Sequence, residues 1–132
     1  MATLKQRTAF FSAVFSYAEM LSIDICIGVI GSGALAASFL HAKMRLVWWV
    51  ILPAAVWVIY TADHLLDAKK IRKEIVNARH KFHREQFTVL AILAAIVALG
   101  CLIAAPLYLS DLVLQGGLSL CLLAALHLAL AF

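Results

Sequence analysis

Two long uncharged stretches constrain the fold of this sequence more than any other feature. No Asp, Glu, Lys or Arg occurs in 86–109 or in 112–132. As an α-helix, each stretch would rise at least about 30 Å, the thickness of the hydrocarbon core of a bilayer. A third uncharged stretch, 46–62, covers most of that thickness. We therefore expect three spanning helices, with Asp111 in the turn between the last two.

The first third of the chain is also apolar, although Glu19 and Asp24 interrupt it. We interpret 8–19 as an amphipathic helix on the membrane surface and 21–40 as a further span. Small residues recur in this span at intervals of four: Gly28 with Ser32, and Gly33 with Ala37. This spacing permits close packing between helices, although small residues can equally well face lipid.

The composition supports an all-α integral membrane fold. Of the 132 residues, 65% are hydrophobic and 14% are charged, whereas a soluble domain has about half and about a quarter. We expect residues 1–132 to form one membrane domain with four spans and a helical loop at 63–85. Three cysteines lie in apolar stretches without a CxxC pair and are interpreted as small core residues: Cys26, Cys101 and Cys121.

The distribution of basic residues predicts the orientation of these spans. With four spans, both termini and the 63–85 loop lie on the same side of the membrane. That side holds nine of the 11 Lys and Arg residues: Lys5, Arg7, Lys69, Lys70, Arg72, Lys73, Arg79, Lys81 and Arg84. By the positive-inside rule, this side is cytoplasmic. Topology thus explains the net charge of +4, so we expect contacts with membrane lipids and none with nucleic acid.

A pair of aspartates stands where the second span is expected to end. Asp63 and Asp67 are four residues apart, so on a helix their β-carbons lie about 5–6 Å from each other and their charges repel. A cation nearby would relieve this repulsion. Magnesium typically binds one or two carboxylates, several waters and the phosphates of a substrate, and the basic loop could neutralise such phosphates. Alternatively, both aspartates are solvated and pair with lysines, for example Asp67 with Lys70.

The segments around these aspartates resemble a known family. The stretch WVIYTADHLLDAKK, followed by NARHKFHRE, is similar to the first conserved region of the UbiA superfamily of intramembrane prenyltransferases, especially divergent bacterial members. In that superfamily an acidic motif, NDxxDxxxD, ends the second span on the cytoplasmic side and binds magnesium diphosphate. The resemblance places Asp63 and Asp67 on the last two aspartates of the motif and implies a bacterial inner membrane.

The resemblance implies roles for several residues. Asp63 and Asp67 would hold Mg²⁺. Asp24 would line a polar chamber above the substrate, unless it is an acid at a helix end that reaches toward the interface. The diphosphate of a polyprenyl substrate would contact four residues of the basic loop: Lys70, Arg72, Arg79 and His83.

The sequence also departs from the family pattern. Ile59 and Tyr60 stand where the full motif has Asn and Asp, so one potential ligand is missing. The family has a second acidic motif in the second half of a larger bundle, whereas this sequence has no acidic residue after Asp111. The resemblance therefore covers only an amino-terminal half.

The histidines and one tryptophan allow further interpretations. His80 and His83 are three residues apart, a spacing compatible with metal ligation, but their basic neighbours favour contact with phosphate. His64 could donate a hydrogen bond to an anion. Trp57 is expected to pack inside the bundle.

Three functions are consistent with the sequence. In the first, the sequence is the amino-terminal part of a UbiA-like polyprenyl transferase, and the 132 residues are inactive alone. In the second, it is a non-catalytic small subunit of a larger respiratory or photosynthetic complex, with other membrane subunits as partners. In the third, His127 is the axial ligand of a haem or a chlorophyll-type pigment, although a single histidine in a span more often hydrogen-bonds a neighbouring helix.

Overall fold

A computed structural model describes residues 11–12, 14–70 and 78–131, with the side chains of 70, 78–80 and 131 left aside. This described part of the chain consists of helices and turns and contains no strand, which confirms the all-α expectation. A short helix, Val14–Met20, comes first. Five labelled helices follow: α2 (Ile23–Phe39), α3 (Trp48–Lys70), α4 (Ala78–Glu85), α5 (Phe87–Tyr108) and α6 (Asp111–Ala131).

Three of the described helices, α3, α5 and α6, are long and apolar enough to cross a membrane. The number rises to four if Val14–Met20 and α2 are counted together as one bent span. Helices α5 and α6 occupy the stretches expected for the last two spans. Helix α3 instead continues past Ala62 to Lys70, so the expected loop begins as about two further turns of the same helix.

The chain bends by 79° between Val14–Met20 and α2, at Leu21 and Ser22. Ser22 adopts the left-handed conformation, with φ 56° and ψ 28°, which is uncommon for residues other than glycine. Its side chain is buried. The indole Nε1 of Trp57 on α3 donates a hydrogen bond of 2.9 Å to the carbonyl oxygen of Leu21. Helix α3 therefore fixes this bend by a polar contact.

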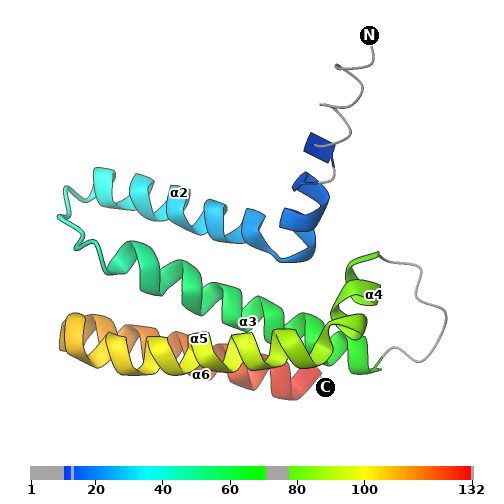
Figure 1. The fold of residues 1–132 in the computed structure, drawn as a ribbon. Helices are drawn as coiled ribbons and strands as arrows, with labels where there is room; N and C mark the ends of the chain where they lie inside the picture. The colour runs from blue at the N-terminus through cyan, green and yellow to red at the C-terminus, as the bar shows by residue number, and fades with distance from the viewer. Residues whose placement is uncertain (1–10, 13, 71–77, 132) are drawn as a thin grey trace, which may run out of the picture.

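Helix α2 packs against the first half of α3 (Figure 1). A Cβ atom added to Gly33 would lie 3.5 Å from Cζ3 of Trp49, whereas one added to Gly28 would meet no atom within 4 Å. Further toward the bend, the thiol of Cys26 donates to the carbonyl oxygen of Pro53 at 3.6 Å. Of the two glycines with four-residue spacing, Gly33 therefore makes the close approach to α3.

A large side chain at Gly33 is expected to separate α2 from α3. The Gly33→Leu variant should unfold at a lower temperature in detergent. Its Cβ would already contact Trp49 at 3.5 Å, so the rest of the leucine side chain adds bulk between the two helices, and overpacking of this kind costs about 1–3 kcal/mol. Gly28→Leu is the matched control on the same helix, at a position with open space. Its unfolding temperature should stay the same or rise, since leucine has the higher helix propensity. Equal effects of the two variants would contradict the close approach at Gly33.

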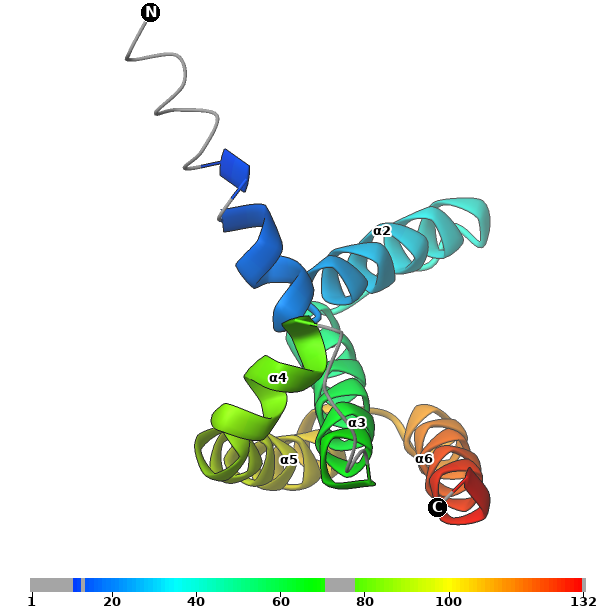
Figure 2. The ribbon, with the colours of Figure 1, turned by 90° about the vertical axis from the view of Figure 1, so that its right-hand side faces the viewer.

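The buried core lies where α3, α4 and α5 meet (Figures 1 and 2). Among the described residues, four apolar side chains on α3 and α5 are buried: Leu65, Ala68, Leu90 and Ala94. Helix α4 crosses the end of α3 and leads into α5. At the opposite end of the bundle, Arg45 Nη1 donates a hydrogen bond of 3.0 Å to the carbonyl oxygen of Tyr108. The core therefore supports the end of α3 that carries the paired aspartates.

Candidate metal-binding site

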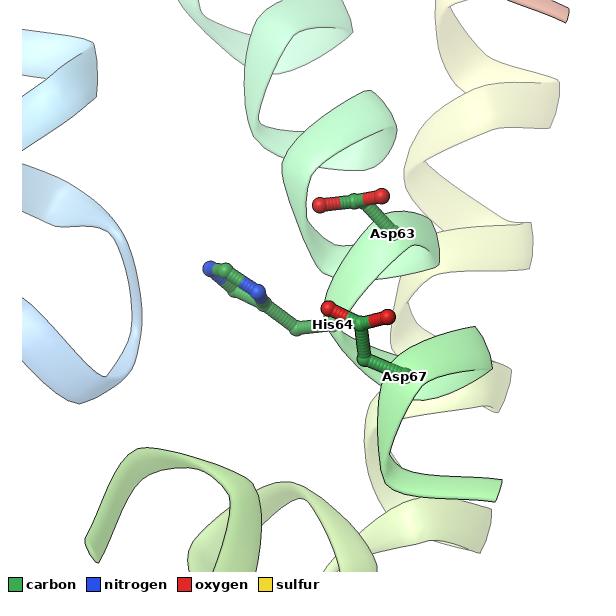
Figure 3. Close-up of side chains that lie close together, drawn as sticks. All are labelled: Asp63, His64 and Asp67. Carbon is green, nitrogen blue, oxygen red and sulfur yellow. The ribbon is translucent and has the colours of Figure 1, made fainter. Parts of the chain in front are cut away.

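Asp63, His64 and Asp67 form a compact group of possible metal ligands on α3. One donor atom from each, a carboxylate oxygen of either aspartate and a ring nitrogen of His64, lie within 4.8 Å of one another. Figure 3 shows the imidazole extending from α3 beside the two carboxylates. All three side chains are half-buried. The group exists because α3 continues past Ala62, and residues four apart on a helix share one face.

His83 brings α4 against this group. The ring centroids of His64 and His83 are 5.1 Å apart, and the ring planes meet at 67°, an edge-to-face arrangement. His83 is only 1% exposed, and the ring of Phe82 lies edge-on to it at 5.7 Å. Both ring nitrogens of His64 are shielded from solvent. The imidazole of His64 therefore lies beside two carboxylates and is covered by a second imidazole.

The described basic side chains at this end of the bundle are exposed. Lys69 Nζ lies 5.9 Å from the centroid of the Phe87 ring. On α4, Lys81 pairs with Glu85 at 3.9 Å. No described Lys or Arg side chain lies within 4.0 Å of the carboxylates of Asp63 and Asp67. Among the described side chains, therefore, no lysine or arginine forms an ion pair with either aspartate.

The other predicted site residues lie away from this group or outside the described residues. Arg72 is outside them, as are the side chains of Lys70 and Arg79, so the alternative pairing of Asp67 with Lys70 falls there too. Asp24 is exposed in the first turn of α2. There the positive end of the helix dipole stabilises its negative charge. His127 is exposed on α6.

The contact between His64 and His83 was not predicted from the sequence. From the sequence, His64 is expected to contact an anion and His83 a diphosphate, and their spacing does not indicate that the two rings meet. One signal was present. Each histidine lies in one of the two segments that resemble the UbiA superfamily, and two segments of one conserved region are expected to converge on one site.

The donor atoms fit a divalent cation. Two carboxylates can hold Mg²⁺, which completes an octahedral shell with water and with phosphate oxygens. Comparison with protein-family models, with curated proteins and with solved structures gives no match. The functional assignment therefore depends on the sequence and on the geometry of this site.

Proposed function

We propose that this chain is the amino-terminal part of a UbiA-like polyprenyl transferase and that the end of α3 binds the diphosphate of its substrate through Mg²⁺. The observation that carries the proposal is the grouping of donor atoms from Asp63, His64 and Asp67 within 4.8 Å, at the end of an apolar helix. The grouping supports the proposal because the resemblance assigns metal binding to the two aspartates.

Residues of α3 bind the cation, and residues of α4 bind the phosphate oxygens. Asp63 and Asp67 hold the cation. Helix α4 crosses the same end of α3, and its exposed Lys81 and Arg84 supply positive charge for phosphate oxygens, together with the predicted Lys70, Arg72 and Arg79. When bound, Mg²⁺ stabilises the negative charge of diphosphate as a leaving group. His83 supports the site through its buried contact with His64.

The prenyl chain of the substrate requires an apolar path away from this end of α3. Helices α3 and α5 are apolar over a length that can cross a bilayer, and they carry exposed apolar side chains such as Val50 and Ile96. A chain that is bound at its diphosphate end would lie along these helices toward the opposite end of the bundle. The substrate is therefore an amphiphile with a diphosphate head and a long apolar tail.

The proposal places the helices in a bacterial inner membrane, with four spans and with the amino terminus and the 63–85 loop in the cytoplasm. Large apolar side chains are exposed along the described helices, including Leu102 and Leu107 on α5 and Leu120 and Leu122 on α6. Exposed apolar surface of this extent is unfavourable in water and favourable in lipid. The basic residues of α4 then face the anionic headgroups of the cytoplasmic leaflet.

Binding of a prenyl diphosphate should depend on the divalent cation. Purified protein in detergent is expected to bind geranylgeranyl diphosphate in the presence of Mg²⁺ and to release it when EDTA removes the metal, as measured by equilibrium dialysis. Geranylgeraniol, which has the same chain without the diphosphate, should bind weakly and without a response to Mg²⁺. Binding that is the same before and after EDTA would contradict the proposed function.

We propose binding alone for these 132 residues, and the resemblance gives the reason. In the family that the chain resembles, a second acidic motif completes the site, and no acidic residue follows Asp111 here. Transfer of the prenyl group is therefore proposed only for a longer protein of which this chain is a part.

A further inference from the structure

The site at the end of α3 differs from a magnesium site made only of carboxylates, because an imidazole belongs to it. We propose that His64 is a direct ligand of the bound metal and makes the site selective for Mn²⁺ over Mg²⁺. The inference deepens the proposed function by naming a third metal ligand and the preference that this ligand confers between the two cations. The role of the diphosphate in this inference rests on the proposed function. The role of His64 as a metal ligand rests on the arrangement of the donor atoms.

The positions of the donor atoms allow all three residues to bind one ion. In an octahedral shell with bonds of about 2.1 Å, ligands on opposite sides of the ion are about 4.2 Å apart. The donor atoms of Asp63, His64 and Asp67 already lie within 4.8 Å of one another. Small rotations of the two aspartate side chains would bring their oxygens and the His64 nitrogen to one ion without a change in the backbone of α3.

The chemical type of the donor atoms determines which ion the site binds more tightly. Mg²⁺ is a hard cation that takes oxygen ligands, so a nitrogen donor adds little to its affinity. Imidazole suits Fe²⁺, Ni²⁺, Cu²⁺ and Zn²⁺ best, whereas carboxylate and water suit Mg²⁺, Ca²⁺ and Mn²⁺. Mn²⁺ begins the first-row divalent series, so it gains less from a nitrogen ligand than those metals but more than Mg²⁺. Mn²⁺ accepts both kinds of ligand, and it also accepts the phosphate oxygens that the proposed substrate offers. A site with two carboxylates and one imidazole should therefore prefer Mn²⁺ to Mg²⁺.

The contact with α4 holds His64 in place for this role. Its ring lies 5.1 Å from the ring of the buried His83, and both of its nitrogens are shielded from water. An exposed histidine would have to lose rotational freedom on binding a metal, whereas the ring of His64 is already packed. His83 is thus a positioning residue, since neighbours that orient a ligating histidine commonly affect metal affinity.

The inference is tested by metal binding to the purified full chain in detergent. Pulsed electron paramagnetic resonance of the Mn²⁺-loaded protein should show coupling to an imidazole ¹⁴N nucleus. The His64→Gln variant should lose this coupling. The ratio of Mn²⁺ to Mg²⁺ affinity should also fall at least about tenfold, while Mg²⁺ affinity changes little.

Two further variants identify which histidine is responsible. His41→Gln makes the same chemical change at an exposed position in the connection between α2 and α3, at the opposite end of the bundle, and should leave coupling and affinities unchanged. His83→Gln should keep the ¹⁴N coupling but weaken Mn²⁺ binding by about 10- to 100-fold. Loss of the coupling in His83→Gln with its retention in His64→Gln would overturn the assignment.

The outcomes separate this inference from the proposed function. A Mn²⁺-loaded protein without ¹⁴N coupling, or coupling that survives in His64→Gln, would overturn the role of His64. The prenyl diphosphate could still bind through Mg²⁺ in that case. Conversely, ¹⁴N coupling that depends on His64, in a protein that binds no prenyl diphosphate, would support the metal site and contradict the proposed substrate.

Discussion

The double variant Asp63→Asn/Asp67→Asn is expected to lose Mg²⁺-dependent binding of geranylgeranyl diphosphate. The carboxylates of Asp63 and Asp67 are the only anionic side chains in the group that they form with His64. Asparagine has nearly the same shape as aspartate but carries no charge. Affinity should fall at least about a hundredfold, which corresponds to ~2.8 kcal/mol of binding free energy. Equilibrium dialysis with and without Mg²⁺ measures the loss directly.

The same variant should be at least as stable as the natural chain when no metal is present. Like charges four residues apart on a helix destabilise it by about 0.2–0.5 kcal/mol, and the amides remove this repulsion. The unfolding temperature in EDTA should therefore stay unchanged or rise slightly. Loss of binding together with retained stability would assign the two aspartates to ligand binding rather than to the fold.

Asp111→Asn provides the matched control for the double variant. Asp111 is an exposed aspartate at the start of α6, at the opposite end of α5 from the site. Its replacement should leave Mg²⁺-dependent binding unchanged. Ligand binding should also raise the unfolding temperature of this control and of the natural chain, but not of the double variant. If Mg²⁺ and the prenyl diphosphate stabilised the double variant equally, the site would lie elsewhere.

Leu90→Ala is expected to cause the largest loss of stability. Leu90 is 4% exposed on α5 and belongs to the core beneath the end of α3. Truncation of a buried leucine to alanine costs about 2–5 kcal/mol, because packing contacts disappear and the cavity closes only in part. Because Leu90 is enclosed by protein, neither lipid nor detergent can fill the cavity that the truncation leaves. Thermal unfolding in detergent should show a clearly lower midpoint.

Leu93→Ala on the same helix is the comparison for this core prediction. Leu93 is 45% exposed, so its truncation removes fewer contacts within the protein. Its unfolding midpoint should lie close to that of the natural chain. A similar decrease for both variants would mean that the interface of α3 and α5 does not form the principal core of the described helices.

The sequence predicts helices well where a long segment contains no charged residue. The uncharged stretches 86–109 and 112–132 correspond to α5 and α6, because an apolar stretch of that length satisfies its backbone groups as a helix. The end of α3 was harder to predict. Asp63 marks where apolar sequence ends, yet the helix continues to Lys70, since hydrogen bonds of the backbone do not depend on the polarity of side chains.

The candidate site could be predicted only in part from the sequence. The four-residue spacing of Asp63 and Asp67 placed both carboxylates on one face, which is a local property of a helix. The contact of His64 with His83 is a tertiary property, because it depends on how α4 crosses α3. The left-handed conformation of Ser22 also escaped prediction, since glycine or asparagine is the usual signal for such a position.

The bend at Leu21 and Ser22 is held by the same helix that carries the candidate metal ligands. Where a helix breaks, terminal carbonyl and N–H groups lose their partners, and hydrocarbon cannot replace them. Trp57 satisfies one such group, the carbonyl of Leu21, and the N–H groups of Leu21 and Ser22 donate to the carbonyls of Tyr17 and Glu19. Asp63 lies about 9 Å further along α3 than Trp57. A shift of α3 would therefore move the bent amino-terminal segment and the candidate site together.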